Sequence, residues 1–368
     1  MREGWEYKKL NEVCDKSSSN IVINKLDDNN GDYPLFGASG LVKNVDFYHQ
    51  DKPYIGIVKD GAGVGRVNTY PAYSSLVGTM QYIFPKEECL LNYVKYFLVK
   101  LDLSHCVSGA TIPHIYFKDY GKKLIPVPPL STQLSIVSEL DKINELIRLK
   151  KEQLKDYDNL AQSIFYEMFG DPVVNEKGWE VKKLREVCEC ITDGDHMPPP
   201  KSDKGVPFVT IGNINKDIRQ IEFDKTFFVP KDYFDNIPYT KKPKQGDILY
   251  TVTGSYGIPL LITFDKEFCF QRHIGLLRPN GLVNSIYLYM WASNKSVKGQ
   301  ADVVATGIAQ RTVSLNSLRG FNIILPPLPL QQLFAQRIEL IEKQKAGVQR
   351  TIKDLETLLA SRMQYWFD

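Results

Sequence analysis

The sequence of 368 residues lacks several features that would place it in a specialised class of protein. No apolar run approaches the ~18 residues that span a bilayer. Residues 1–4 lack the apolar core of a signal peptide. The six cysteines are scattered, which is not the pattern of a disulfide framework. We therefore expect a cytoplasmic globular protein without membrane contact, whose net charge of +3 is only weakly indicative of an anionic partner.

The sequence also has little that resembles catalytic machinery. The glycine-rich stretch Gly61–Arg66 lacks the Gly-Lys-Ser/Thr ending of a P-loop. The tetrapeptide Asn236–Tyr239 lacks the second proline of the adenine-binding loop found in amino-methyltransferases. Cys188 and Cys190 have no second cysteine or histidine pair with which to form a zinc site. We expect no catalytic residue, no bound metal and no bound cofactor in this chain.

What the sequence does contain is an internal repeat. The stretch GWEYKKLNEVC at 4–14 returns as GWEVKKLREVC at 178–188, with nine of eleven positions identical. A second pair of segments, 109–133 and 307–331, shares a first glycine, a Pro-Pro-Leu motif and a final glutamine. The offset is 174 residues for the first pair and 198 for the second, so the inserts between them differ by 24 residues. Each half is therefore a repeated frame around a different insert.

A long helix is predicted after each Pro-Pro-Leu motif, because proline is tolerated before a helix and not within it. Apolar residues then recur at three- and four-residue steps over ~38 residues, with interruptions at Lys150, Lys345 and Arg362. The residues predicted to pair the helices or bind a partner are Ile136, Leu140, Ile143, Ile147, Leu154 and Ile164 in the first helix, and Phe334, Ile338, Ile341, Val348, Ile352 and Leu355 in the second. We expect the two helices to pack as an antiparallel coiled coil.

The inserts are predicted to be mixed α/β with many short strands. Residues 52–70 have the pattern of a strand, a glycine-rich turn and another strand. Segments 206–214, 246–257 and 269–279 are β-rich in the second insert, and 91–102 and 284–295 are predicted as short helices. The expected fold class is α+β, with two mixed α/β domains, two long helices and a pseudo-twofold internal repeat.

The doubled arrangement of opening motif, Pro-Pro-Leu-x-x-Gln motif, long helix and Met-Phe-Gly-Asp-Pro ending resembles the DNA-specificity subunit of type I restriction-modification enzymes. The resemblance covers nearly the whole chain. It implies a target recognition domain at 1–128, a spacer helix at 129–170, a second target recognition domain at 171–326 and a second spacer helix at 327–368.

The family implies a function in defence against foreign DNA. Each recognition domain is expected to read one half of an asymmetric, split target in double-stranded DNA. Two methyltransferase subunits are expected to bind the helices and to carry S-adenosylmethionine and adenine-N6 methylation. Endonuclease-translocase subunits are expected to supply ATP- and Mg-dependent cleavage, so this chain itself is expected to be non-catalytic.

Polar and basic side chains on loops and at strand ends are the candidates for DNA contact, because such groups read base edges and hold phosphates. In the first insert they are Ser39, Lys43, Lys59, Arg66 and Asn68. In the second they are Asp193, Asp195, His196, Lys201, Asn213, Thr251, Thr253, Ser255, Tyr256, Gln271, Arg272 and His273.

Three other readings stay open from the sequence. The chain could serve a related bipartite system with a fused methyltransferase-endonuclease. It could be a coiled-coil scaffold that binds proteins and no DNA, or a stand-alone enzyme whose catalytic residues carry no motif.

Overall fold

The computed structural model describes residues 4–109, 113–216, 218–307 and 310–368, and its chain forms two compact units. Unit 1 comprises Met1–Glu152 and Gln349–Asp368, and unit 2 comprises Gln153–Val348. Each unit therefore contains one insert and one half of each long helix. Among the described residues, no helix combines the length and apolar character needed to cross a bilayer.

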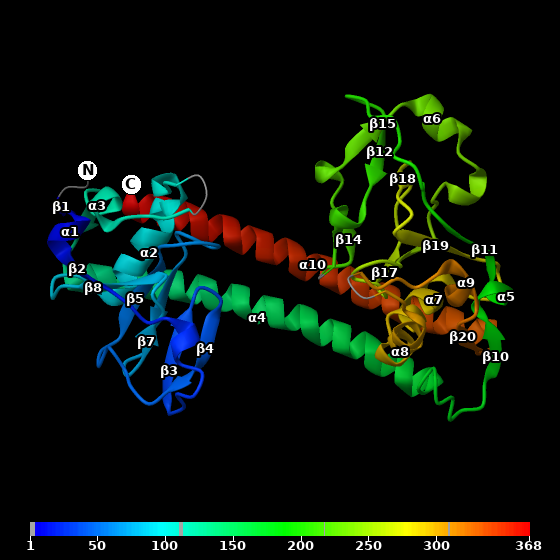
Figure 1. The fold of residues 1–368 in the computed structure, drawn as a ribbon, viewed down its shortest axis with the longest axis horizontal. Coiled ribbons are helices and arrows are strands. Elements are labelled where there is room, and N and C mark those ends of the chain that lie inside the picture. Colours follow the sequence, from blue (N-terminus) through cyan, green and yellow to red (C-terminus); the bar gives the residue numbers. More distant parts are fainter. Residues whose placement is uncertain (1–3, 110–112, 217, 308–309) are drawn as a thin grey trace. The chain divides into compact units, whose positions relative to one another are not determined.

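The strands of unit 1 form two sheets and a two-stranded ribbon (Figure 1). The ribbon pairs β1 (Glu6–Lys9) with β9 (Leu124–Val127). A four-stranded antiparallel sheet has the order β2 (Cys14–Ser18), β8 (Met80–Pro85), β5 (Tyr54–Val58), β6 (Val67–Tyr70). A three-stranded sheet has the order β4 (Gly40–Val45), β3 (Tyr33–Gly37), β7 (Ser75–Leu76), with β3 and β7 parallel. The helices are α1 (Leu10–Val13), η1 (Ile23–Lys25), α2 (Leu91–Leu101), η2 (Leu103–Cys106) and α3 (Phe117–Tyr120).

Unit 2 has the same strand topology although its insert is unlike in sequence. Its ribbon pairs β10 (Glu180–Lys183) with β20 (Asn322–Leu325). Its four-stranded sheet has the order β11 (Cys188–Asp193), β19 (Ile274–Pro279), β16 (Ile248–Thr251), β17 (Pro259–Leu261). Its three-stranded sheet has the order β15 (Phe227–Val229), β12 (Val206–Val209), β18 (Cys269–Phe270), again with one parallel pair. In chain order, these strands correspond one to one with β1–β9.

The extra length of the second insert lies between the shared strands. It forms the hairpin of β13 (Ile214–Asn215) and β14 (Gln220–Ile221), with η3 (Ile211–Asn213), η4 (Phe223–Lys225), α6 (Lys231–Asn236) and η5 (Tyr239–Lys241). The other short helices of unit 2 are α5 (Leu184–Val187), α7 (Ser285–Ala292), α8 (Lys295–Val304) and α9 (Leu315–Arg319). The predicted α/β character of both inserts is confirmed.

The repeated motifs fold in the same way in both units. Glu12 and Glu186 accept hydrogen bonds from the backbone amides of Lys9 and Lys183, which caps a short helix in each repeat. Gln133 is fully buried, accepts from the amide of Leu90 and donates to two carbonyls. The equivalent Gln331 is bound in the same manner by its own unit. The Pro-Pro-Leu-x-x-Gln motif thus locks the start of each long helix to the insert.

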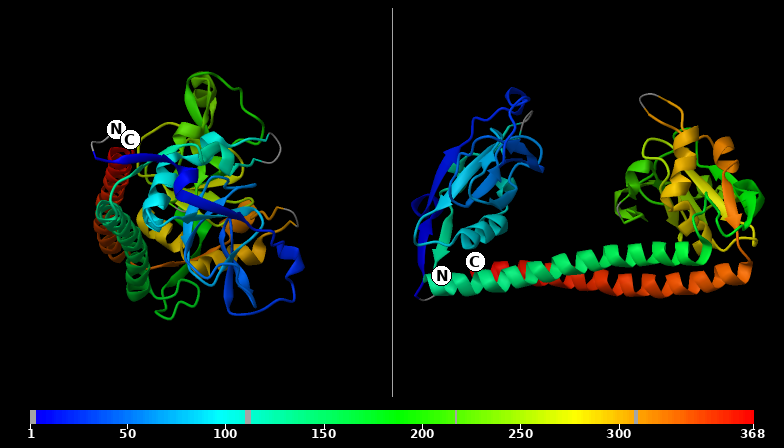
Figure 2. Two further views of the ribbon diagram at one scale, coloured as in Figure 1. Left: turned by 90° about the vertical axis from the view of Figure 1, so that its left-hand side faces the viewer. Right: turned by 90° about the horizontal axis from the view of Figure 1, so that it is seen from below.

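The two long helices are α4 (Leu130–Phe169) and α10 (Leu328–Phe367), each of 40 residues, slightly longer than the sequence predicted. The predicted stripe residues are all buried or half-buried, which confirms the apolar face. Within unit 1, α4 and α10 run antiparallel, because Lys151 pairs with Glu356 at 2.8 Å while Arg362 pairs with the earlier Glu139 (Figures 1 and 2). Arg362, one of the polar interruptions of the stripe, is therefore an ion-pair position.

Unit 2 shows the same antiparallel packing of its own helix halves. Lys345, the polar interruption in α10, lies 2.7 Å from Asp158 of α4. Phe334, near the start of α10, packs against Phe165 and Phe169, near the end of α4, with ring centroids 5.7 and 5.2 Å apart. Each unit therefore completes its core with the last turns of the helix that began in the other half of the sequence.

Candidate nucleic-acid interface

Four loop segments of unit 1 converge at one end of its four-stranded sheet. The amide of Gly78, in the β7–β8 turn, donates to the carbonyl of Ile21 after β2 at 2.8 Å. The amide of Lys59, at the start of the β5–β6 turn, donates to Thr79 at 3.0 Å. Gly61 of the same turn donates to Pro113 at 2.9 Å, in the segment that leads to β9. Main-chain hydrogen bonds thus join segments far apart in sequence into one loop cluster.

The equivalent segments of unit 2 make the same hydrogen bonds. The amide of Arg272, in the β18–β19 turn, donates to Asp195 after β11 at 3.0 Å. Val252 donates to His273 at 3.0 Å, and Gly254 of the β16–β17 turn donates to Arg311 at 2.9 Å. These bonds connect the same four places in the fold. The two units therefore present equivalent loop clusters that carry different side chains.

Most of the residues predicted for the second insert meet in this cluster. Asp193, Asp195 and His196 follow β11 or end it; Thr253, Ser255 and Tyr256 lie in the β16–β17 turn; Gln271, Arg272 and His273 form the β18–β19 turn. Their roles in DNA contact stay predictions, but their convergence is a structural fact that sequence spacing did not reveal.

The β11 end of the cluster is fixed by internal contacts. Asp193 lies 2.8 Å from the Nε2 atom of His196, and Lys241 donates to the carbonyl of Gly194 at 3.1 Å. Asp195 accepts from the hydroxyl of Tyr233 at 2.9 Å. The carboxylates are therefore held in place before any ligand arrives.

Three predicted residues of the second insert are buried, among them Thr253, which is 8% exposed and accepts a hydrogen bond from the hydroxyl of Thr312 at 3.4 Å. Asn213 is 7% exposed, accepts from Thr210 and donates to the carbonyl of Lys225. Thr251 is fully buried and donates to the carbonyl of Ser255 at 2.7 Å. These side chains lie inside the fold, so we remove Asn213, Thr251 and Thr253 from the candidates for direct contact. Lys201 lies outside the cluster, with its ammonium 5.0 Å from the ring of Phe227.

In unit 1, Lys59 and Arg66 lie in the β5–β6 turn, which contains glycines with φ near +80 to +88° at 61, 63 and 65. Only glycine adopts such angles without strain. Arg66 is exposed and donates to the carbonyl of Ala38 at 3.2 Å, beside the exposed Ser39 of the β3–β4 turn. Asn68 is exposed on β6.

Lys43 has a different environment from the other candidates of the first insert. Its ammonium donates to the carbonyl of Leu26 at 2.7 Å, away from the loop cluster. Its side chain therefore supports a loop within unit 1.

The sequence missed several residues that surround Tyr256. Its hydroxyl donates to Asp302 of α8 at 2.8 Å, which raises the pKa of the tyrosine and lowers that of the aspartate. The cationic groups of Lys298 and Arg311 lie 5.4 and 5.6 Å from the centroid of its ring. From the extra hairpin, Lys216 donates to the hydroxyl of Ser255 at 2.7 Å. Only Arg311, within the repeated lead-in segment, stood in a stretch that the sequence had marked.

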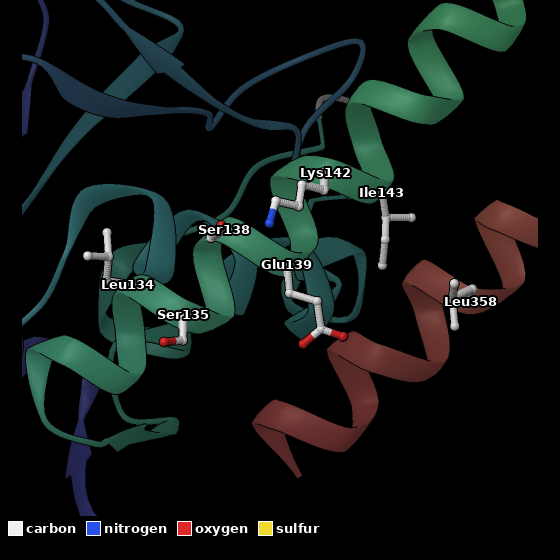
Figure 3. Close-up of a pocket in the computed structure, with 7 residues that line it drawn as sticks. All are labelled: Leu134, Ser135, Ser138, Glu139, Lys142, Ile143 and Leu358. Atoms are coloured by element: carbon white, nitrogen blue, oxygen red, sulfur yellow. The ribbon is translucent and has the colours of Figure 1, made fainter.

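A second surface of interest lies on α4 within unit 1. A groove of about 660 Å³ is lined by Leu134, Ser135, Ser138, Glu139, Lys142, Ile143 and Leu358 (Figure 3). Figure 3 shows Glu139 extending toward α10, where it binds Arg362 and Trp366. Leu134 is 62% exposed, and a second groove along the same helix includes Leu146, which is 47% exposed. Exposed leucines outside the buried stripe mark a surface suited to a protein partner.

In the part of the chain that the structure describes, no group of three or more histidine, cysteine, aspartate or glutamate side chains is placed to hold a metal ion. Burial raises the pKa of the Cys188 thiol to about 12 and also raises that of Cys190. These cysteines are therefore neutral thiols at physiological pH.

Comparison with known proteins gives a consistent result. The family model of the type I restriction modification DNA specificity domain matches residues 2–156 and 176–357. The type I restriction enzyme MjaVIII specificity subunit of Methanocaldococcus jannaschii is 24% identical over 313 residues, which are 77% of this chain and 73% of that protein.

Solved structures show the same fold. The type I restriction-modification S subunit of M. genitalium aligns over 99% of this chain and 96% of its own, with 15% identity and a TM-score of 0.54. A chain from a structural study of complex assembly in the type I restriction-modification system aligns over 100% and 98%, with 18% identity and a TM-score of 0.55.

Proposed function

Because this chain belongs to the family of type I restriction-modification DNA-specificity subunits, we propose that it directs its enzyme complex to a bipartite, asymmetric DNA target. The matched relatives are specificity subunits of type I restriction enzymes, and this chain is likewise a specificity subunit and not the catalytic component. Each loop cluster reads one half of the target. The observation that carries this proposal is one loop frame, present twice, with different side chains on each copy.

The chemistry of the loop clusters suits both base reading and phosphate binding. Base edges in the major groove are read by side chains that donate and accept hydrogen bonds, while phosphates are held by cations and backbone amides. Each cluster offers both kinds of group on loops whose backbones are already fixed by hydrogen bonds. Unlike side chains on the two copies suit unlike half-sites.

We propose that α4 and α10 set the distance between the half-sites. Each helix is continuous over 40 residues, about 60 Å at 1.5 Å per residue. Half-sites on one duplex must also keep a fixed rotation, because DNA turns once in roughly 34–36 Å. A pair of packed helices supplies both constraints, which a flexible linker does not.

The exposed leucines of α4 in unit 1 are the proposed dock for one methyltransferase subunit. Two such subunits, carrying S-adenosylmethionine and methylating adenine at N6, and endonuclease-translocase subunits that use ATP and Mg, complete the proposed cytoplasmic complex. Leu134→Asp, which places a charge in both grooves, is expected to weaken co-purification with the methyltransferase. Val174→Asp, at a residue 74% exposed outside the grooves, is the matched control. Equal retention of the methyltransferase by both variants would rule out this dock.

The central experiment is mapping of methylated sites in cells that express this chain with its methyltransferase. A split motif is expected, and exchange of residues 15–108 for another insert should change one half of that motif only. Deletion of one heptad from each helix should change or abolish the recognised spacing. A contiguous motif, a change in both halves, or an unchanged spacing would contradict the corresponding part of the proposal.

The three alternative functions that the sequence left open are distinguished by other results. Methylation or cleavage by the purified chain alone would indicate an enzyme. The absence of any sequence-specific methylation with the methyltransferase present would indicate a protein scaffold. A fused methyltransferase-endonuclease encoded beside this chain would indicate the related bipartite system.

A further inference from the structure

The two inserts differ in the number of their arginines and in whether the guanidinium groups already have partners within the protein. The first insert contains a single arginine, Arg66. The second contains Arg219, Arg272 and Arg278, with Arg311 and Arg319 in the frame that follows. Arginine matters here because its planar fork of donors matches the O6 and N7 acceptors of guanine in the major groove.

Most arginines of unit 2 are committed to internal contacts. Arg278 is 1% exposed and pairs with Asp247 at 2.8 Å. Arg219 donates to Ser293 at 2.6 Å, and Arg319 donates to the carbonyl of Ile191 at 2.7 Å.

Arg311 belongs to the cluster but is also held within it. Its guanidinium donates to the carbonyl of Asp302 at 2.8 Å and lies beside the ring of Tyr256. This leaves Arg272 as the uncommitted arginine of the cluster.

Arg272 has an exposed side chain on a fixed backbone. Its amide is bonded to Asp195, the amide of Gln271 to Val209, and that of Ile274 back to Gln271. Gln271 and His273, on either side, bind each other at 3.0 Å. Among the described residues, the guanidinium of Arg272 makes no hydrogen bond or ion pair. The turn therefore presents this one side chain outward at little cost in backbone entropy.

The equivalent position in unit 1 is Gly78, which has no side chain to offer. There, the exposed arginine comes from a different loop of the same frame: Arg66 of the β5–β6 turn, whose guanidinium lies against Gly63. A β-carbon at Gly63 would lie 2.4 Å from the Arg66 Nη2 atom, so a side chain there would displace the guanidinium from this position. The two units thus place their exposed arginine in different loops, and Arg66 also donates to the carbonyl of Ala38.

We propose that Arg272 is a specificity-determining residue that reads a guanine in the half-site bound by unit 2. The inference rests on the proposed function and adds to it a residue and a base. The fork of Arg272 donates two hydrogen bonds to O6 and N7 of that guanine, a pairing that no other base provides in the major groove.

The test uses the full chain co-expressed with its methyltransferase, and mapping of methylated sites in the host genome. The half-site of unit 2 is the half that survives exchange of residues 15–108. Arg272→Ala is expected to lower the discrimination against other bases at one guanine position of that half by about 5- to 150-fold. The other half should keep its consensus.

Two further variants distinguish a base contact from a phosphate contact. Arg272→Lys keeps the charge but replaces the planar fork with a single ammonium. A phosphate contact would survive this change, whereas the guanine preference should fall, although less than it does for alanine, because lysine also reaches the O6 and N7 acceptors. Arg66→Ala should leave the unit 2 half-site intact. Arg185→Ala, an exposed arginine of α5 outside the cluster, is the matched control and should change nothing.

Several results would overturn the inference. They are an unchanged consensus with Arg272→Ala, a uniform decline at all sites, and loss of preference at a base other than guanine. Because Arg272 is exposed, the unfolding midpoint of its variants should match the wild type, and a lowered midpoint would assign the residue a structural role. If the wild-type chain yields no split motif, the proposed function fails together with this inference. A split motif with an unaffected guanine overturns the inference alone.

Discussion

The core of unit 1 is predicted to depend on the last residues of the chain. Phe367 is 5% exposed, and its ring centroid lies 5.1 Å from that of Tyr93 and 5.8 Å from that of Phe97. Truncation of a buried phenylalanine to alanine costs about 3–5 kcal/mol, from lost burial and from the cavity left behind. A domain of this size is stable by roughly 5–15 kcal/mol. Phe367→Ala is therefore expected to remove a large part of the stability of unit 1.

Hydrogen exchange measures this effect strand by strand. Amides of β5 and β8 that exchange through unfolding of unit 1 should exchange at least about 100-fold faster in Phe367→Ala, because each 1.4 kcal/mol is a factor of ten. Gln364→Ala, at an exposed position one turn earlier, is the control. The mirror variant Phe169→Ala should instead affect β16 and β19, because Phe169 packs against Tyr287 at 4.9 Å. Unchanged exchange in β5 and β8 of Phe367→Ala would refute the assignment of the C-terminal turn to the core of unit 1.

Three further predictions concern single contacts. Gln133→Ala should lower the free energy of unfolding by about 1–3 kcal/mol, measured by denaturant titration, because buried backbone groups at the start of α4 lose their partner; an unchanged midpoint would contradict this. Asp247→Asn should cost about 3–5 kcal/mol, because it leaves the 1%-exposed Arg278 without its counter-charge; thermal unfolding no different from wild type would exclude a buried ion. Glu139 has a pKa lowered chiefly by the hydrogen bond from Arg362. Its contribution to stability is therefore present above the ordinary glutamate pKa of about 4.5 and is lost as the pH falls through the lower folded value. In Glu139→Gln, the free energy of unfolding should therefore depend less on pH in the acid range. An unchanged pH dependence would show that the pair of Glu139 and Arg362 contributes nothing to stability.

The long helices and the repeat were accessible from the sequence because they rest on local and periodic signals. The Pro-Pro-Leu motif predicted where each helix begins, and the recurrence of apolar residues predicted which face is buried. The same local reasoning predicted the two strands around the glycine turn at 61–65, which became β5 and β6. Ion pairs such as Lys345 with Asp158 were less accessible, because a lysine within an apolar stripe shows its partner only once the opposing helix is in register.

The loop cluster was not accessible because main-chain hydrogen bonds hold it together. The bond from Gly61 to Pro113 and its counterpart from Gly254 to Arg311 connect segments more than 50 residues apart, and neither depends on a side chain. Burial was equally invisible: Thr251 had the chemistry of a surface donor but is fully buried. Asp302, the partner of Tyr256, lies in a helix that the sequence patterns had not marked.

The same property explains how two inserts of unlike sequence share one frame. A cluster held by amides and carbonyls tolerates almost any side chain at its tips, provided that glycines remain where the backbone requires them. In unit 1 the β7–β8 turn places Gly78 where the β18–β19 turn of unit 2 places Arg272, and both amides make the same hydrogen bond to the segment after the first strand. A β-carbon at Gly78 would lie 3.1 Å from the carbonyl oxygen of Ile21, so an arginine at this position requires only a small shift of that backbone. If the proposed role of Arg272 is correct, introducing Gly78→Arg should leave unit 1 folded and alter the base preference of its half-site alone. An unfolded unit 1, or an unaltered base preference of its half-site, would show that an arginine cannot take the same role in the β7–β8 turn as in the β18–β19 turn.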